Sequence, residues 1–145
     1  MMKSILVLGT GGREYAIVKR LREDSVKLNE TINIICIQTN MNDKIKCYAN
    51  LVIECNLLEE LPNTLTQIMK CNDIILCIVG SEDFLLKGVG DFFKHKNIPC
   101  MGPTVTCSKL ETSKMFCRTY IENIKDLSKY NPEFNVYYSK NEFLY

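Results

Sequence analysis

The chain has 145 residues, which is about one domain with a buried core, and its 46% apolar and 24% charged residues are typical of a soluble globular protein. A formal net charge of +1, without a block of Lys or Arg, argues against binding to nucleic acid or to an anionic membrane. The first apolar run is too short for a signal peptide or a membrane span, so we expect a cytoplasmic protein.

Strand-like and helix-like segments alternate along the first hundred residues. The pattern predicts strands at 5–8, 33–37, 51–53, 74–79 and 98–101, and helices at 13–23, 57–69 and 85–95. Pro62 is expected to lie in a first turn or to kink the second of these helices. Apolar strands that alternate with helices predict an α/β fold with an open, doubly wound parallel sheet.

The chain changes character after Gly102-Pro103. We expect an amphipathic helix at 108–124, a strand at 134–138 and the start of another helix at 141–145. A domain rarely ends one turn into an element, so this part is predicted to be an incomplete subdomain at 104–145 that follows a domain at 1–103. Its apolar side chains, which include Leu110, Phe116 and Phe134, would then be exposed, and we expect self-association or a partner chain to cover them.

Eight cysteines are many for this length, but their spacing does not indicate a metal site. None forms a C-x-x-C pair, and the only histidine is His95, so the usual ligand spacing of tetrahedral zinc is absent. Cys36, Cys77 and Cys100 lie within apolar strand-like runs, where a reduced thiol packs as a small hydrophobe. We therefore expect reduced cysteines and no metal.

The most informative stretch is Ile-Leu-Val-Leu-Gly-Thr-Gly-Gly-Arg-Glu at 5–14. Its glycines let the backbone turn tightly and approach a ligand, and the N-terminus of the helix that follows favours an anion. Arg13 adds a cation where a bare helix would not favour one. These features predict a phosphate site at Gly11, Gly12 and Arg13; the alternative is a plain strand–turn–helix corner with a solvated arginine.

A nicotinamide cofactor is one candidate ligand, because glycine-rich turns of this kind also bind dinucleotides. The usual spacing is G-x-G-x-x-G, with an acidic residue near the end of the second strand. Here position 14 is Glu, and the second strand ends in Gln38-Thr39-Asn40 without a carboxylate. The pattern therefore favours a phosphorylated sugar over a dinucleotide.

Glu82 follows the strongest strand and could accept hydrogen bonds from ribose hydroxyls or stabilise an amine. The alternative is a carboxylate at a helix start, stabilised by the helix dipole. In a doubly wound sheet, ligands bind beyond the carboxyl ends of the strands. The loops at 9–14, 80–83 and 102–104 are therefore expected to converge.

Three motifs in register resemble the N-terminal part of glycinamide ribonucleotide synthetases, the phosphoribosylamine–glycine ligases. Residues 9–16, Gly-Thr-Gly-Gly-Arg-Glu-Tyr-Ala, resemble G-x-G-G-R-E-H-A of that family, and residues 79–85 resemble its V-G-P-E-x-P-L. Gly102-Pro103-Thr104 and residues 110–116 resemble G-P-T followed by L-E-G-S-K-x-F. The resemblance covers nearly the whole chain.

The resemblance implies a Rossmann-like pre-ATP-grasp domain at 1–103 and the start of an ATP-grasp subdomain at 104–145. The family joins glycine to 5-phosphoribosylamine with ATP and Mg²⁺ in purine synthesis. By position, Glu14 and Glu82 would join Gly11, Gly12 and Arg13 in the phosphoribosylamine pocket. Lys114 would approach the nucleotide phosphates, although an ordinary exposed helix lysine is the equal alternative.

Several departures bear on activity. The family's P-G-N-x-G loop is replaced by residues 38–42, Tyr15 replaces a histidine, Ser81 and Phe84 replace prolines, and Thr112 replaces a glycine. The family enzyme is about three times longer, so the lid, the metal-binding carboxylates and the C-terminal domain are expected to be missing.

We therefore expect an N-terminal portion of an ATP-dependent C–N ligase that is inactive alone and binds neither ATP nor Mg²⁺ tightly by itself. Its expected partners are a small phosphoribosyl ligand and either a polypeptide that completes the ATP-grasp domain or a second copy, with no nucleic acid and no membrane. The alternatives are a non-catalytic phosphosugar- or nucleotide-binding module and an NAD(P)-binding Rossmann domain.

Overall fold

The computed structural model describes residues 2–55 and 59–143, and the chain divides into two compact units, Met1–Ser108 and Lys109–Tyr145. The first unit contains one sheet and the helices that cover it. The second unit contains short helices and an extended segment.

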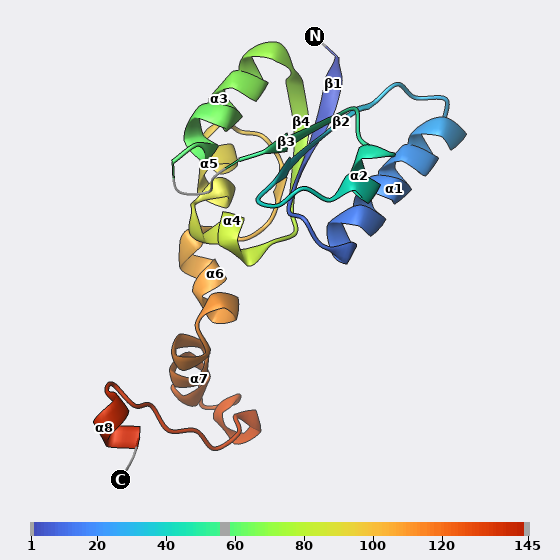
Figure 1. Ribbon diagram of the computed structural model, residues 1–145. Helices are drawn as coiled ribbons and strands as arrows, with labels where there is room; N and C mark the ends of the chain where they lie inside the picture. The colour runs from blue at the N-terminus through green and yellow to red at the C-terminus, as the bar shows by residue number, and fades with distance from the viewer. Residues whose placement is uncertain (1, 56–58, 144–145) are drawn as a thin grey trace. The chain divides into compact units, whose positions relative to one another are not determined.

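The sheet of the first unit has five parallel strands in the order β3-β2-β1-β4-β5 (Figure 1). The strands are β1 (Lys3–Leu8), β2 (Asn33–Gln38), β3 (Leu51–Glu54), β4 (Asp73–Val79) and β5 (Cys100–Met101). The chain runs outward from β1 to β3 and then returns to the other side of β1 with β4, so the strand order reverses between β1 and β4. The predicted α/β fold with an open, doubly wound parallel sheet is confirmed, and the point of reversal is where such sheets bind ligands.

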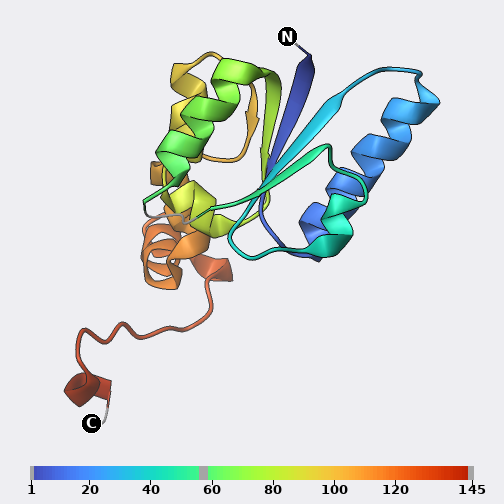
Figure 2. The same cartoon turned by 45° about the horizontal axis from the view of Figure 1, so that its top comes forward.

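Helices cover both faces of this sheet (Figures 1 and 2). One face carries α1 (Gly12–Lys27) and α2 (Asp43–Lys46), and the other carries α3 (Leu61–Cys71), α4 (Glu82–Leu86) and α5 (Val89–His95). Successive side chains of a strand point to opposite faces of the sheet, so the core consists of two clusters, one on each face.

The central strand β1 illustrates this division of the core. Ile5 and Val7 belong to the cluster with Val18 of α1, whereas Leu6 and Leu8 belong to the cluster with Phe93 of α5. Both faces of the sheet are buried, which is why its strands consist of near-continuous apolar runs.

Two helices of the first unit differ from the prediction. The helix expected at 85–95 is two helices, α4 and α5, because Gly88 between them has a left-handed φ of 78° that interrupts helical geometry. The helix α3 begins at Leu61, with Pro62 in its first turn, so that alternative for the proline is confirmed. Leu57 and Leu58, which the prediction included, lie outside the described residues.

The second unit departs further from the prediction. The single helix expected at 108–124 is wrong: α6 (Val105–Thr112) ends and α7 (Lys114–Glu122) begins anew, because the Ser113 hydroxyl accepts a hydrogen bond from the Phe116 amide and caps α7. A 3₁₀ turn, η1 (Ser128–Tyr130), and a short helix, α8 (Lys140–Phe143), follow. The helix start expected at 141–145 is confirmed for its described residues.

The strand expected at 134–138 is also wrong. Its residues have no regular secondary structure, and no strand described in this unit is available to pair with them. A strand needs a neighbour to satisfy its backbone groups, so alternating side chains alone do not produce one. None of the described residues from 109 to 143 is buried, in contrast to the first unit.

Among the described helices, none has both the length and the apolar character required to cross a bilayer.

Candidate functional site

The glycine loop, residues 9–12, connects β1 to α1 at the point where the strand order reverses. Gly9 has a φ of +134°, and its amide donates to the carbonyl of Ile37 at the end of β2 (3.0 Å). Gly11 precedes the first turn of α1, and Gly12 begins the helix. The turn therefore presents the N-terminus of a 16-residue helix at the carboxyl edge of the sheet, a position that suits an anion.

Glu14 fixes the shape of this loop. It is only 3% exposed, and its carboxylate accepts a hydrogen bond from the Gly11 amide (Oε2, 2.6 Å). A glutamate in the first turn that accepts from the residue before the helix satisfies one of the amides that a helix start leaves unpaired. A Cβ on Gly9 would lie 2.6 Å from Cγ of Glu14, and a Cβ on Gly80 would overlap the Glu14 carboxylate. Two glycines on different strand ends thus make room for one buried glutamate.

Arg13 lies directly beside this carboxylate. Its Nε donates to Oε1 of Glu14 at 3.2 Å, while 59% of its side chain remains exposed. One edge of the guanidinium is therefore oriented by Glu14, and the exposed remainder is accessible to a ligand at the start of α1. An Arg fork suits phosphate because it can donate two parallel hydrogen bonds.

The loop after β2 is tied to the glycine loop. The Asn42 side chain donates to the Thr10 carbonyl (2.8 Å), and the Thr10 and Thr39 hydroxyls are 3.4 Å apart. Gln38 is fully buried; its Oε1 accepts from the Asn42 amide (2.9 Å), and its Nε2 has no partner among the described residues. The segment 38–42, which differs from the family motif, therefore supports the glycine loop through hydrogen bonds of its own.

Sequence reasoning did not single out these contacts. The one available signal was Asn42 directly before Asp43, the pattern of a helix cap: its side chain accepts from the Lys44 amide at 3.1 Å and begins α2.

The loop after β4 begins against the same glutamate. Gly80 donates its amide to the Leu8 carbonyl (2.9 Å) and lies in contact range of Glu14, so the ends of β1 and β4 meet there. Glu82 follows two residues later, exposed, in the first turn of the five-residue helix α4. This placement is compatible both with a ligand-binding carboxylate near the glycine loop and with a helix-start carboxylate.

The third predicted loop packs against the second. A Cβ on Gly102 would lie 2.9 Å from the Leu85 side chain and 3.2 Å from Val79, the last residue of β4. The Asp91 carboxylate accepts from the Val105 amide at 2.8 Å and begins α6. The loops after β1, β4 and β5 are thus successive neighbours along the carboxyl edge of the sheet, as predicted.

Tyr15, which replaces the family's histidine, packs away from this loop. Its ring meets Tyr48 edge to face at a centroid distance of 5.8 Å, within the cluster on the α1 face of the sheet. A hydrogen bond with Tyr15 raises the pKa of Tyr48, because ionisation would have to break or reverse that bond. The substitution therefore contributes to packing between α1 and the segment that follows α2.

Lys114 lies in the second unit, at the first position of α7, and is exposed. With Met115, Arg118 and residues 134–137 it lines a cavity of about 370 Å³. Lys114 and Arg118 are four residues apart on one helix, so both cations are on the same side of α7.

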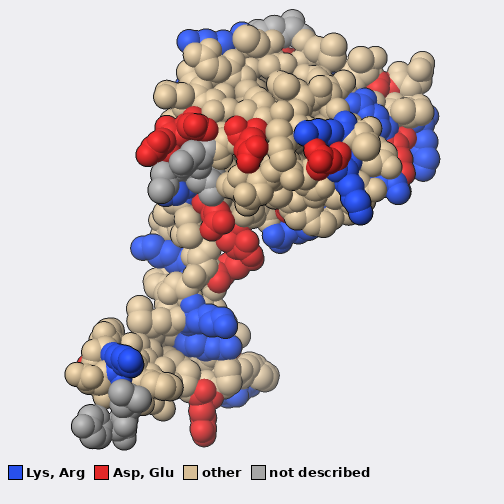
Figure 3. Space-filling view, viewed as in Figure 1, with Lys and Arg blue, Asp and Glu red and all other residues tan. Residues whose placement is uncertain are grey.

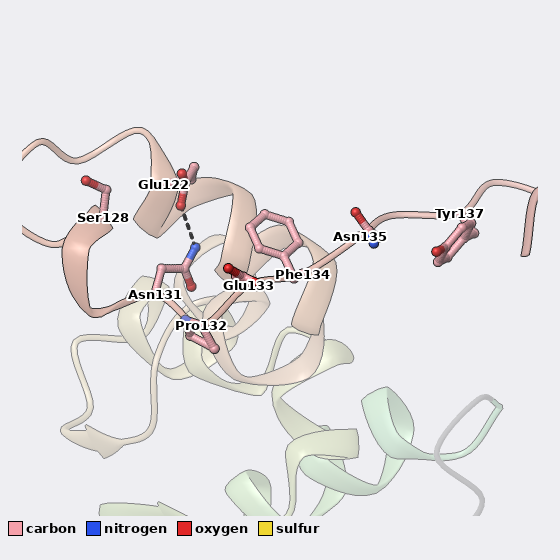
Figure 4. Close-up of a pocket in the computed structure, with 8 residues that line it drawn as sticks. All are labelled: Glu122, Ser128, Asn131, Pro132, Glu133, Phe134, Asn135 and Tyr137. Carbon is pink, nitrogen blue, oxygen red and sulfur yellow. Dashed lines mark hydrogen bonds between the residues drawn. The ribbon is translucent and has the colours of Figure 1, made fainter.

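A larger hollow of about 760 Å³ lies beside this cavity in the second unit (Figure 4). It is lined by polar groups from the end of α7, from η1 and from the extended segment: Glu122, Ser128, Asn131, Glu133 and Asn135, with Pro132, Phe134 and Tyr137. The Asn131 amide donates to the Glu122 carboxylate at 2.9 Å. Within residues 2–55 and 59–143 there is no cluster of three or more His, Cys, Asp or Glu side chains able to hold a metal.

Charges of both signs are interspersed over the part of the surface shown in Figure 3. Several of these charges form an ion pair with a residue of the same helix: Arg20 with Asp24 in α1 at 2.7 Å, and Lys46 with Asp43 in α2 at 2.6 Å. This distribution agrees with the net charge of +1.

Comparison with known proteins matches this chain to one family and to enzymes that are much longer. The model of the family described as "Phosphoribosylglycinamide synthetase, N domain" matches residues 3–111. The phosphoribosylamine–glycine ligase of Methanocella arvoryzae is 32% identical over 138 residues, which are 92% of this chain and 29% of that enzyme. The corresponding ligase of Pseudomonas syringae is 31% identical over 124 residues, 84% of this chain and 26% of the relative.

The bifunctional purine biosynthetic protein purD of Dictyostelium discoideum is 31% identical over 118 residues, 81% of this chain and 14% of its own length. The chain thus spans less than a third of each of these relatives.

A solved structure supports the fold. The N5-carboxyaminoimidazole ribonucleotide synthetase of Thermotoga maritima superposes with a TM-score of 0.55 over 83% of this chain and 30% of its own, at 11% identity. At that identity the likeness concerns the fold alone.

Proposed function

The chain belongs to the phosphoribosylglycinamide synthetase N-domain family, and we propose that it is the N-terminal, substrate-binding part of a phosphoribosylamine–glycine ligase. The longer ligases of the family join glycine to 5-phosphoribosylamine at the expense of ATP. In this proposal residues 1–103 form the pre-ATP-grasp domain that holds the phosphoribosyl substrate, and residues 104–145 begin the ATP-grasp domain.

The observation that carries the proposal is the glycine loop fixed by the buried Glu14. The Glu14 carboxylate fixes Gly11 and orients Arg13 (2.6 and 3.2 Å), so the start of α1 and a guanidinium are pre-positioned on one side of the loop. We assign the phosphate of the substrate to Arg13 and to the start of α1 at Gly12. The Gly11 amide is held by Glu14, and the missing side chain of Gly11 lets the phosphate approach closely. Pre-positioning favours binding because less freedom is lost when the ligand arrives.

Glu14 and Glu82 have different parts in this proposal. Glu14 positions the loop and does not contact the ligand, because both its oxygens already accept hydrogen bonds within the protein and its side chain is nearly inaccessible. Glu82 is exposed beyond the strand that meets Glu14, so it is the carboxylate available to ribose hydroxyls or to the amine of the substrate. Its role therefore depends on ligand contact, whereas the role of Glu14 does not.

ATP and Mg²⁺ belong to the complete enzyme in this proposal. Lys114 is the one residue of this chain that we assign to the nucleotide phosphates, where its charge would neutralise phosphate oxygens. The described residues contain no cluster of three metal-ligating side chains, so they do not form a metal site of that kind by themselves. Because the chain spans less than a third of the ligases that it matches, we expect no ligase turnover from this polypeptide alone.

Binding calorimetry on the whole chain tests the phosphate site. We expect ribose 5-phosphate to bind and ribose to bind at least about tenfold more weakly, because charge-assisted hydrogen bonds to phosphate are worth about 1.5–3 kcal/mol. Arg13→Ala should weaken ribose 5-phosphate by about tenfold or more. Arg20→Ala removes an equal charge from the exposed face of α1 and should leave the affinity unchanged. Equal losses in both variants, or equal affinities for ribose and ribose 5-phosphate, would contradict the site.

Three further assays separate the remaining functions. Incubation of the purified chain with ATP, glycine and phosphoribosylamine should release no ADP above background; sustained ADP release would overturn the proposal that the chain needs the rest of the enzyme. Titration with NADH distinguishes a nicotinamide-binding domain, which should bind NADH in preference to glycinamide ribonucleotide. A non-catalytic phosphosugar-binding module would bind the ribonucleotide equally well but would yield no activity when a downstream ATP-grasp polypeptide is added.

A further inference from the structure

Two cysteines lie side by side on neighbouring strands, far apart in the sequence. Cys77 is in β4 and Cys100 is in β5, the short amber strand beside β4 in Figure 2. The parallel ladder pairs these two residues directly, and the amide of Cys77 donates to the carbonyl of Pro99 at 2.9 Å. Both side chains belong to the cluster on the α3–α5 face of the sheet, so they are on the same side of it.

This placement suits a disulfide bond. Paired residues on adjacent strands are about 4.8 Å apart, which is within the range of about 4.4–6.8 Å between Cα atoms that disulfides span. Both side chains enter the same apolar cluster, so the two sulfur atoms lie on one side of the paired strands.

The two thiols differ in a way that distinguishes their roles. Cys77 is fully buried, and burial raises its pKa strongly, so it remains a thiol. Cys100 is half-buried on the edge strand, and hydrogen bonding with the neighbouring Cys77 lowers its pKa. Cys100 is therefore the more accessible sulfur and the better nucleophile, with Cys77 directly behind it.

Cys36 provides an internal contrast. It is as buried as Cys77 and lies in β2, but its partners in the ladder are Val7 and Val52, and it belongs to the cluster on the other face of the sheet. Burial alone raises its pKa to about 12. Burial in this sheet therefore does not by itself place a second cysteine beside a thiol, and the pairing of Cys77 with Cys100 is a separate feature.

We propose that Cys77 and Cys100 form a redox-active dithiol pair that closes to a disulfide in response to a hydroperoxide. The Cys100 thiolate attacks one peroxide oxygen and breaks the O–O bond, which yields a sulfenic acid on Cys100 and, after protonation, water when the oxidant is hydrogen peroxide. The Cys77 sulfur then attacks the sulfenic sulfur, forms the S–S bond, and its proton leaves with the departing hydroxide as a second water. The peroxide is reduced by two electrons, and the two thiols are oxidised by two.

The bond would attach the edge strand β5 to its neighbour β4. The strand β5 has only two residues, and it leads directly into Gly102, which packs against Val79 at the end of β4 and against Leu85 of α4. Oxidation should therefore hold the loop that follows β5 more firmly, while reduction returns it to a ladder of a few backbone hydrogen bonds.

Peptide mapping of the whole chain after brief treatment with hydrogen peroxide tests the proposal. We expect a linked peptide that contains Cys77 and Cys100, has lost two hydrogens and disappears on reduction with dithiothreitol. Backbone amide exchange in β5 and in the loop after it should be slower in the oxidised chain. The control Cys36→Ser should form the same linked peptide.

Two variants separate the roles. In Cys77→Ser, dimedone should trap a sulfenic acid on Cys100, because no resolving thiol remains. In Cys100→Ser, Cys77 should stay reduced at the same peroxide dose.

Two results would overturn the proposal. One is a wild-type chain in which the exposed Cys47 and Cys107 oxidise while Cys77 and Cys100 stay unlinked. The other is a Cys100 that couples to other cysteines as often as to Cys77. Because the wild-type map decides by itself, a variant that failed to fold would not leave the question open.

Discussion

The two units of this chain contain similar proportions of apolar residues but differ in what they bury. In Met1–Ser108, both faces of a parallel sheet are covered, and side chains such as Phe84 and Phe93 are completely inaccessible. In Lys109–Tyr145, the apolar residues of α7 remain accessible, with Phe116 stacked on Tyr120 at 6.0 Å and each at least 37% exposed. A sheet with helices on two sides closes a core, whereas short helices and an extended segment do not.

The difference has a simple physical origin. A helix of nine residues is marginal in water unless an apolar face packs against something, and segments below about 40 residues rarely build a core of their own. The first unit therefore supplies most of the stability of the chain.

The largest expected effect is a core truncation in the first unit compared with the same truncation in the second. Phe93→Ala should lower the free energy of unfolding by about 3–5 kcal/mol, because it leaves a cavity in a packed core. Phe116→Ala should change it by less than about 1 kcal/mol, since its ring is already 37% exposed. Urea denaturation followed by circular dichroism measures both. A similar loss in the two variants would mean that the units fold as one body.

A smaller effect is expected where Gly80, after β4, packs against the Glu14 side chain of the first unit. Gly80→Ala should destabilise the protein by about 1–3 kcal/mol, because the new methyl group would overlap the Glu14 side chain. Gly12→Ala is the matched control: a Cβ there meets nothing within 4 Å, and the stability should change by no more than about 1 kcal/mol, in the stabilising direction. Thermal unfolding distinguishes them, and equal melting temperatures would show that Glu14 does not occupy the space beside Gly80.

A smaller effect is expected in the loop after β2. Asn42→Ala should cost about 1 kcal/mol, since it removes both the cap of α2 and the hydrogen bond to the Thr10 carbonyl. The exposed neighbour Asn40 supplies the control, because Asn40→Ala removes an equal side chain from the surface. Denaturant titration of the two variants measures the difference; a larger loss at Asn40 would contradict the assigned contacts.

The smallest effect depends on pH. A hydrogen bond with Lys46 lowers the pKa of the Asp43 carboxyl below its ordinary value of 3.8, so this pair contributes stability above pH 3.8 and loses it as the pH falls through the lowered pKa. Lys46→Ala should therefore reduce stability slightly at neutral pH and not at all once Asp43 is protonated. Both groups are exposed, so the change is expected to be close to the limit of detection in a pH series of melting curves.

The fold of the first unit could be predicted from the sequence because its strands are continuous apolar runs and three of the four connections between them carry helical spacing. The helix α2 in the remaining connection was not predicted, because four residues are too few to show a helical period. The breaks in helices could not be predicted from periodicity, because Gly88 and Ser113 act through one backbone angle and one capping hydrogen bond. The expected strand at 134–138 failed for a different reason: alternation needs a second strand, and pairing is not visible in a single segment.

The candidate site was predictable in part. Glycines, Arg13 and Glu82 were selected from type and spacing, and the structure brings their loops together. The internal contacts of Glu14 depend on the side of α1 that it occupies and on Gly80, which is 66 residues away along the chain. A pattern of neighbouring residues cannot predict a contact between such distant positions. The buried Gln38 was likewise hidden, since a polar residue at the end of a strand usually indicates the surface.

The most direct test of the proposed site is a titration of the isotope-labelled whole chain with ribose 5-phosphate, followed by amide proton–nitrogen spectra. We predict saturable shifts at Gly11, Gly12 and Arg13 and in the loop around Glu82, with the amides of α7 unchanged. Shifts centred on α7, or no saturable shift in the glycine loop, would contradict a sugar-phosphate site in the first unit.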